Sequence, residues 1–409
     1  MKKILFVLQD IPFPAKHGSR MRTWSIINAL YKEYDLSVIC WDFKQGESAL
    51  SEAQKYFKNI WIVPRKSLHY KTEKLSIFQR FLNFAQYKPW EIAKAYSQIF
   101  DKYFQTITAR FHFDIIFARY VAYQGQYLLN NKSLLRGTKL IIDIDDIGPI
   151  LTERNIEIRG TSGFYDKNRQ KINLFFYRQY YKKLTSINSC LVCSDLDRHF
   201  IHEKISKKIN LSVVPNTVCS NSFQGKNIIK KNIFENKVIL FCANLSYKLN
   251  ADAIIWFAKF VLPKIKQKCK NAKLHVVGWS PPDEVKALTQ STAISVYANV
   301  PDVSEYYRNS LIAIAPLLSG GGSRIKLIEA MSFMRPIVAT AIGAEGLDLE
   351  NNKHCFIADT PVDFAKACIA LLSNYNLAVS MSESAYRHFR ENFNRNQIKR
   401  KIQEVFSSV

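Results

Sequence analysis

Short apolar runs alternate with longer amphipathic stretches along the first half of the chain. This alternation of strand-like and helix-like segments indicates a parallel sheet with helices on both faces. A helix is predicted at residues 20–31. Strands are predicted at residues 4–8, 36–41, 59–63, 115–118, 140–144 and 189–193.

The same alternation starts again in the second half. Helices are predicted at residues 251–265 and 325–334, and a polar helical stretch at 383–406. Strands are predicted at residues 237–243, 273–277, 294–297, 312–316 and 336–340. A second strand-helix series indicates a second parallel sheet.

A segment rich in Asn, Ser and Lys separates the two halves, and 409 residues suffice for two domains. We therefore predict an α/β chain of two doubly wound, Rossmann-like domains, residues 1–215 and 237–385, with a linker at 216–236. A C-terminal helix at 386–409 is expected to pack back on the first domain. Such sheets bind ligands at the carboxyl ends of their strands, which places a ligand in a cleft between the domains.

The strongest chemical signal follows the predicted strand 312–316. Gly320, Gly321 and Gly322 form a turn that lets the backbone approach a ligand closely. Ser323 is expected to open the next helix, whose free N–H groups and dipole suit a diphosphate. Arg324 adds a cation that can bind phosphate in a bidentate manner. This segment therefore predicts a phosphate-binding turn.

The segment 316–340 resembles the C-terminal signature of the retaining glycosyltransferase family with the GT-B fold that is often called GT4. Four further stretches resemble its capsule and exopolysaccharide branch, in the same order along the chain: residues 250–263, 274–278, 300–307 and 344–347. The resemblance implies the GT-B fold, in which two Rossmann-like domains face a central cleft. It also implies transfer of a sugar from a nucleotide diphosphate sugar with retention of configuration.

Several donor-binding residues follow from the resemblance. Lys248 corresponds to the family's phosphate-binding lysine, and Glu329 to the carboxylate that binds the ribose. The loop expected near the base contains Asp302 and Val303. The complete donor set implied in this way is Gly18, Ser19, Asn244, Lys248, Asp302, Val303, Gly321, Gly322, Ser323, Arg324, Lys326 and Glu329.

The chain departs from the family pattern at two positions. Gly321 stands where the family has the first of two glutamates, and Asn244 stands where it has an arginine. The first glutamate helps to hold the transferred sugar, so the identity of that sugar stays open. Arg324 or Lys326 is expected to supply the missing positive charge.

The loop at residues 12–22 resembles the first strand-to-helix loop of the family. Gly18 and Ser19 would let the backbone approach donor phosphate or an acceptor hydroxyl, and Arg20 or Arg22 would reach an acceptor phosphate. His17 is either an acceptor-binding base or an ordinary loop residue.

Three carboxylates, Asp143, Asp145 and Asp146, stand at the end of the predicted strand 140–144. Asp145 and Asp146 are expected to hydrogen-bond the sugar or to accept a proton, in place of the histidine that many family members have there. The alternative is an Asp-x-Asp metal site. The resemblance favours a metal-free mechanism without a cofactor, in which Lys248, Arg324 and N–H groups stabilise the leaving diphosphate.

The chain has 58 Lys and Arg against 34 Asp and Glu, a net charge of +24, which indicates an anionic partner. Residues 65–110 and 169–183 mix cations with aromatic side chains, as interfacial helices do. No signal peptide and no apolar run of about 18 residues is found. We expect a cytoplasmic protein, peripheral on the inner face of the membrane, that acts on a lipid-linked glycan acceptor.

Three other functions fit parts of the sequence. A GT-B sugar-nucleotide epimerase would use the same donor without an acceptor. A non-catalytic scaffold would explain Gly321 and Asn244. A nucleic-acid-binding protein is suggested by charge alone and lacks any recognition motif.

Overall fold

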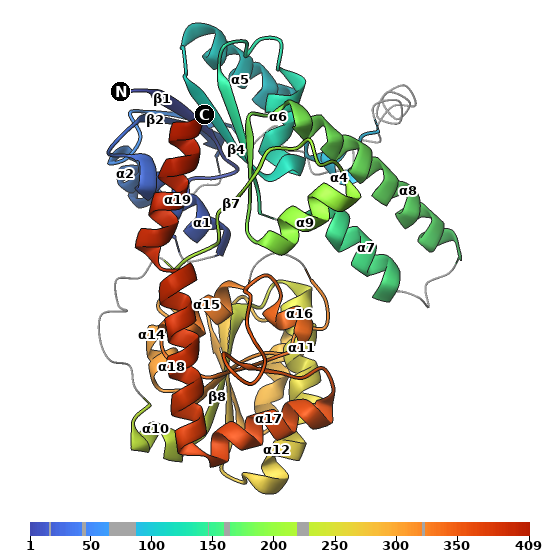
Figure 1. The fold of residues 1–409 in the computed structure, drawn as a ribbon, viewed down its shortest axis with the longest axis vertical. Helices are drawn as coiled ribbons and strands as arrows, with labels where there is room; N and C mark the ends of the chain where they lie inside the picture. Colours follow the sequence, from blue (N-terminus) through green and yellow to red (C-terminus); the bar gives the residue numbers. More distant parts are fainter. Residues whose placement is uncertain are drawn as a thin grey trace. The chain divides into compact units, whose positions relative to one another are not determined.

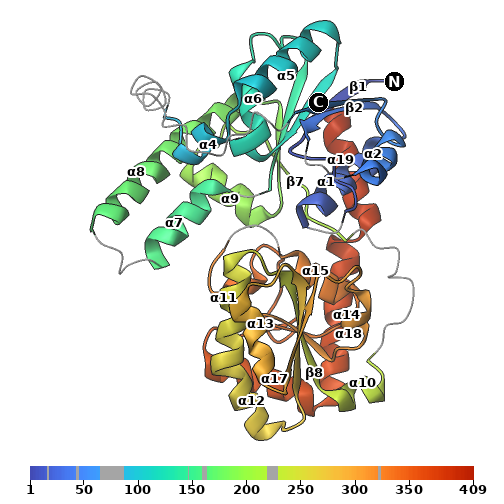
Figure 2. The same cartoon turned by 180° about the vertical axis from the view of Figure 1, so that it is seen from behind.

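The computed structural model describes residues 1–15, 18–42, 46–64, 87–145, 147–158, 164–218, 229–320 and 324–409. The chain forms two compact units, shown in Figures 1 and 2. Unit 1 consists of Met1–Pro215 and Lys399–Val409, and unit 2 consists of Asn216–Ile398. Unit 1 is therefore built from two segments that are far apart in the sequence.

Unit 1 contains a seven-stranded sheet in the order β3-β2-β1-β4-β5-β6-β7, and all its strand pairs are parallel. The order reverses direction at β1, which is typical of a doubly wound sheet. The strands are β1 Lys3–Val7, β2 Asp35–Trp41, β3 Asn59–Val63, β4 Ile115–Arg119, β5 Lys139–Ile144, β6 Ser189–Val192 and β7 Leu211–Val213.

Helices cover both faces of this sheet, so its central strands are buried on both sides and read as continuous apolar runs. Helices α7 and α8 lie side by side and extend away from the sheet (Figures 1 and 2). The helices of the first segment are α1 Gly18–Leu30, α2 Glu47–Gln54, α4 Trp90–Ala95, α5 Gln98–Arg110, α6 Gly125–Asn130, α7 Gly148–Ile158, α8 Phe164–Tyr181 and α9 Asp195–Lys204.

The second segment of unit 1 comes from helix α19, Arg395–Ser408. From Lys399 onward its residues belong to unit 1. Ile402 and Phe406 are buried there, and the ring of Phe406 lies 5.8 Å from that of Phe117 on β4. This helix thus completes the apolar core around β4.

Unit 2 contains a six-stranded parallel sheet in the order β10-β9-β8-β11-β12-β13. Its strands are β8 Val238–Asn244, β9 Lys273–Trp279, β10 Ile294–Ala298, β11 Ile312–Ala315, β12 Ile337–Ala339 and β13 Phe356–Ile357. Its helices are α10 Lys231–Asn236, α11 Lys248–Trp256, α12 Leu262–Lys268, α13 Asp283–Lys286, α14 Ser304–Arg308, α15 Ile325–Ser332, α16 Ala341–Ala344, α17 Pro361–Ser373 and α18 Tyr375–Asn392.

The prediction of an α/β chain with two Rossmann-like sheets is confirmed. The stretch predicted as polar and helical at 383–406 is helical, and it is divided into α18 and α19. Phe393 leaves the helical conformation (φ −121°, ψ 2°), and its carbonyl accepts a hydrogen bond from Thr217 Oγ1. The helix predicted at 325–334 ends earlier, because Met334 has a left-handed φ of 55°.

Candidate functional site

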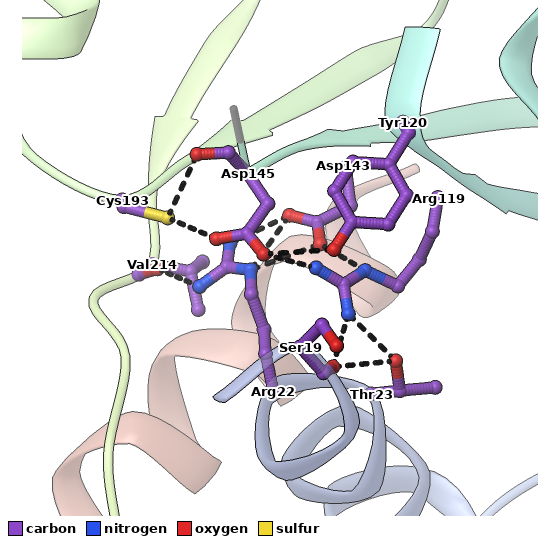
Figure 3. Close-up of polar contacts among 9 residues, drawn as sticks. All are labelled: Ser19, Arg22, Thr23, Arg119, Tyr120, Asp143, Asp145, Cys193 and Val214. Atoms are coloured by element: carbon purple, nitrogen blue, oxygen red, sulfur yellow. Dashed lines mark hydrogen bonds and ion pairs between the residues drawn. The ribbon is translucent and has the colours of Figure 1, made fainter. Parts of the chain in front are cut away.

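In unit 1, a group of charged side chains lies buried at the carboxyl ends of β4 and β5 (Figure 3). Arg119 ends β4 and faces Asp143 on β5 in the strand register. The Nε atom of Arg119 lies 3.0 Å from Oδ2 of Asp143. Arg22 on α1 binds the same carboxylate, with Nη2 to Oδ1 at 2.6 Å and Nε to Oδ2 at 2.9 Å. Two arginines thus neutralise Asp143 in the interior.

Arg22 does not occupy the acceptor-contacting position that the sequence analysis expected. Its side chain is only 1% exposed, and its Nη1 atom donates a 2.7 Å hydrogen bond to the carbonyl of Val214. Burial alone would lower the pKa of Arg22, but the charges of Asp143, Cys193 and Asp145 and the hydrogen bond to Asp143 together outweigh it, so the pKa is raised. We therefore correct the role of Arg22 to that of a structural partner of Asp143.

Asp145 lies just after β5 and has a side chain that is 14% exposed. Arg119 Nη2 donates to its Oδ2 atom, which also accepts from the Tyr120 hydroxyl at 3.3 Å. The Cys193 thiol lies 3.3 Å from Oδ1. Burial raises the pKa of Asp145, but the charge of Arg119 and the other donors outweigh it, so the pKa is lowered.

Arg119 also connects this group to the first turn of α1. Its Nη1 atom donates to the carbonyl of Ser19 and, at 2.7 Å, to the hydroxyl of Thr23. Sequence reasoning missed Arg119, Tyr120 and Cys193. The available signal was an arginine at the end of one buried strand and an aspartate at the end of the next.

The other residues predicted in unit 1 are placed less tightly. Gly18 and Ser19 begin α1, and Arg20 in its first turn donates from Nε to Asp10 Oδ2 at 3.0 Å. Arg20 is partly exposed, unlike Arg22. His17 and Asp146 lie outside the described residues.

In unit 2, side chains around the carboxyl end of β8 form a chain of hydrogen bonds. Asn244 ends β8, and its carbonyl accepts from Asn250 Nδ2 on α11 at 2.8 Å. Asn250 Oδ1 in turn accepts from Lys326 Nζ on α15 at 2.7 Å. The Asn244 side chain accepts from the hydroxyl of Ser246 at 2.8 Å. The structure thus brings together two residues of the predicted donor set, Asn244 and Lys326.

Glu329 follows Lys326 by three positions on α15, a spacing that puts both on one side of the helix. Its Oε2 atom accepts from the Tyr307 hydroxyl at 3.0 Å. Burial raises the pKa of Glu329 to about 7, against the hydrogen bond of Tyr307 and the charge of Lys326. Burial lowers the pKa of Lys326 to about 7, and the charge of Arg324 lowers it further. Both groups can therefore change charge near neutral pH.

Arg324 directly precedes α15 and is buried. Its Nε atom donates to the carbonyl of Ile342 at 3.2 Å. Gly320 has a φ of 127°, which favours glycine, and a Cβ there would lie 3.4 Å from Arg324 Nη1. Gly321, Gly322 and Ser323, which complete the predicted phosphate-binding turn, lie outside the described residues.

The remaining predicted donor residues of unit 2 lie at or just before the first residue of a helix. Lys248 begins α11, has a side chain that is 86% exposed, and pairs with Asp252 at 3.1 Å. Asp302 Oδ1 accepts from the backbone N–H of Ser304 at 2.9 Å, and Val303 directly precedes α14. These contacts do not join the hydrogen-bond chain of Lys326. Across the described residues, no three His, Cys, Asp or Glu side chains gather to hold a metal ion.

Comparisons with known proteins agree with this architecture. Residues 236–374 match the family model for glycosyl transferases group 1. A protein of Klebsiella pneumoniae described as an uncharacterized 44.6 kDa protein in a cps region is 23% identical, over 100% of this chain and 99% of its own.

Two solved structures illustrate the similarity in fold. Sucrose-phosphate synthase from Thermosynechococcus elongatus superposes with a TM-score of 0.72 at 11% identity, over 100% of this chain and 99% of its own. Anabaena Alr3699/HepE in complex with UDP and glucose superposes with a TM-score of 0.65 at 14% identity, over 100% of both chains. The chain therefore has the GT-B fold, and together with the matched glycosyl transferases group 1 segment this supports a glycosyltransferase.

Proposed function

We propose that this protein is a retaining hexosyltransferase-like enzyme of the GT4 type, which moves a sugar from a nucleotide diphosphate sugar to a glycan acceptor in surface polysaccharide or glycoconjugate biosynthesis. The observation that carries the proposal is the group of Lys326, Asn250 and Glu329 on α11 and α15, inside the matched segment 236–374. The relative from a cps region supports the polysaccharide pathway. The complex of Alr3699/HepE with UDP and glucose supports a nucleotide-sugar donor.

The donor would be bound by unit 2. Glu329 is a carboxylate that can accept hydrogen bonds from the ribose hydroxyls once it is ionised. Arg324 and Lys326 would bind the diphosphate together with the N–H groups of Gly321, Gly322 and Ser323, and the exposed Lys248 would add a mobile cation. Asp302 and Val303 would lie near the base, and Asn244 would contact the donor at the end of β8.

The acceptor would be bound by unit 1. Asp145 offers a partly exposed carboxylate, and Asp146 is its neighbour in the sequence. Arg20 would reach an acceptor phosphate, His17 would bind the acceptor, and Gly18 and Ser19 at the start of α1 would approach donor phosphate or an acceptor hydroxyl. In a same-face substitution the departing phosphate takes the proton of the acceptor hydroxyl, so the protein needs no strong base. The cations at the diphosphate would stabilise the charge that develops on the leaving group, without a metal ion or cofactor.

A lipid-linked acceptor would require the enzyme to work at a membrane surface. Helices α4 and α8, with Tyr87 just before α4, offer such a surface through four exposed side chains, Tyr87, Trp90, Ile172 and Phe175. The rings of Tyr87 and Phe175 are 5.8 Å apart, and Lys94 Nζ lies 4.7 Å from the centre of the Trp90 ring. Cations beside aromatic rings suit the headgroup region of anionic lipid. We propose that the enzyme binds there, on the inner face of the cytoplasmic membrane.

None of the helices that the structure describes is both long and apolar enough to cross a bilayer. The proposed attachment is therefore carried by the surface of α4 and α8, together with the charge of +24. Of the cation-rich stretches predicted from the sequence, residues 65–86 lie outside the described residues, and residues 87–110 and 169–183 lie within them.

Thermal-shift measurements against a panel of nucleoside diphosphates and sugar nucleotides test the donor site. A ligand at about 100 times its Kd adds about 2.7 kcal/mol of stability. We expect one base to stabilise the protein well above the others. Product analysis with that donor then separates transfer from its rivals. A changed sugar nucleotide without an acceptor would mean an epimerase, and binding without any turnover would mean a scaffold.

A further inference from the structure

The carboxylate of Asp145 is held by donors from three separate places in unit 1 (Figure 3). Arg119 at the end of β4 and Tyr120 just after it donate to Oδ2, and Cys193 just after β6 donates to Oδ1. Both carboxylate oxygens are therefore engaged. The proposed function uses Asp145 but gives no role to these three donors.

Contacts with other residues also fix the position of the Arg119 side chain. Its Nε atom lies 3.0 Å from Asp143 Oδ2, and its Nη1 atom donates to Thr23 Oγ1 at 2.7 Å. Arg22 holds the far side of Asp143, with Nη2 at 2.6 Å from Oδ1. Since the guanidinium is planar and rigid, these contacts also determine where Nη2 points.

Tyr120 supports the same arrangement. It has a left-handed φ of 61°, which is uncommon for a residue with a side chain. The centre of the Tyr120 ring lies 4.5 Å from the guanidinium carbon of Arg119. The Tyr120 hydroxyl donates to Asp145 Oδ2 at 3.3 Å. Tyr120 thus combines a left-handed backbone with two side-chain contacts, one to Arg119 and one to Asp145.

The exposure of the side chains identifies which member of the group can meet a substrate. Asp143 is fully buried, while Arg22 and Arg119 are 1% and 3% exposed. Asp145 is 14% exposed. Asp143, Arg22 and Arg119 form a buried support, and the Asp145 side chain that they hold keeps some exposed surface.

We propose that Arg119 is a positioning residue which, with Tyr120 and Cys193, holds the Asp145 carboxylate in a fixed, ionised state. Asp145 then accepts hydrogen bonds from substrate hydroxyls and does not act as a proton acceptor. A carboxylate that already receives several donors gains little from taking a proton. The charges that face it are those of Arg119, Arg22 and Asp143. This inference rests on the proposed function, because it assigns the role of Asp145 in sugar transfer.

The charge state can be measured without any turnover. The full chain is labelled with [4-¹³C]aspartate, and the Asp145 carboxyl resonance is identified by its loss in Asp145→Asn. In the wild type this resonance should stay at its ionised position down to below about pH 3.9, the ordinary value for aspartate. In Tyr120→Phe and Cys193→Ala the midpoint should rise by about 0.5 to 1 pH unit, because each loses one donor.

Cys190→Ala is the matched control. Cys190 is also a buried thiol on β6, and the loss of its side chain should leave the Asp145 resonance unchanged. A wild-type midpoint at or above the ordinary value overturns the proposal, as does an equal response to Cys190→Ala and Cys193→Ala. This readout is informative even if the protein transfers no sugar, so it separates failure of the inference from failure of the proposed function.

Turnover supplies the second readout. Arg119→Lys keeps the positive charge but loses the planar guanidinium that binds several acceptors at once. We therefore expect kcat to fall at least about tenfold, with donor KM nearly unchanged. An Arg119→Lys variant with wild-type kcat would overturn the role assigned to Arg119.

Discussion

The Nζ atom of Lys326 donates a 2.7 Å hydrogen bond to Oδ1 of Asn250 and so connects α15 to α11. The same amine lies 4.8 Å from the centre of the Phe241 ring. The lysine is thus held next to the end of β8. Burial lowers the pKa of Lys326 to about 7.

Binding of nucleoside diphosphate should depend on pH with a maximum near pH 7. Below that value Glu329, whose pKa is about 7, takes a proton and loses the negative charge with which it would bind the ribose hydroxyls. Above it Lys326 loses the proton that gives it a charge for the phosphate. Affinity should therefore fall on both sides, which calorimetric titration from pH 5.5 to 9 would measure.

Two variants separate the limbs of this profile. Glu329→Gln should remove the acid limb, and Lys326→Met should remove the alkaline limb. Lys248→Met is the matched control, because Lys248 is largely exposed and should lower affinity equally at every pH. A flat profile for the wild type between pH 6 and 8 would contradict the assignment of both groups.

Glu329→Ala should weaken donor binding without unfolding unit 2. Loss of a hydrogen bond to a charged group costs about 1.5–3 kcal/mol, which corresponds to about a ten- to hundredfold rise in Kd. Glu305→Ala, on the exposed side of α14, is the control and should bind as the wild type does. Equal donor affinity and activity in Glu329→Ala and the wild type would exclude Glu329 from the donor site.

Much of the fold follows from the sequence, because strands buried on both faces are almost continuously apolar. Residues 115–118 illustrate this, since they were predicted as a strand and lie in β4. Arg119 could not be assigned in the same way. A charged residue after an apolar run usually marks the surface, and its burial depends on the register that brings Asp143 opposite to it.

The division between α18 and α19 was also beyond the reach of helical periodicity. It depends on a hydrogen bond between Thr217 and Phe393, which are far apart in the sequence. Glu329 and Lys326 were predicted as donor residues through the family resemblance, and the structure adds Tyr307 and Asn250 as their hydrogen-bond partners. Such partners are set by tertiary packing, which local sequence does not determine.

Sugar transfer should survive EDTA. Asp143 is paired with two arginines and Asp145 with one, so neither carboxylate has the uncompensated charge that a divalent cation requires. Initial rates measured in EDTA and after addition of Mn²⁺ or Mg²⁺ would test this. Loss of activity in EDTA with recovery on either ion would instead assign the aspartates to a metal site.

The protein should bind anionic vesicles but not neutral ones, and salt should weaken the binding. Each cation near such a surface contributes about 1 kcal/mol, and screening at physiological salt acts over about 8 Å. Replacing Lys171, Lys182 and Lys183 by Ser should reduce co-sedimentation and activity on a lipid-linked acceptor. Arg178 should contribute less, because it is paired with Glu153 at 2.9 Å.

The aromatic part of this surface can be tested separately. Trp90→Ser with Phe175→Ser should weaken vesicle binding even at low salt, because their rings would lie at the headgroup level. Phe260→Ser, an exposed aromatic residue of unit 2, is the matched control. Donor hydrolysis should be unchanged in both the double variant and the control. If the wild type ignores anionic vesicles at low salt, the charge of the chain serves another partner.

Helix α19 has a consequence for how the protein is made. Residues 399–409 are synthesised after all of unit 2, yet Ile402 and Phe406 belong to the core of unit 1. The nascent chain must therefore keep β4, with Phe117, incompletely packed while unit 2 is being synthesised. The unit that is translated first is completed last.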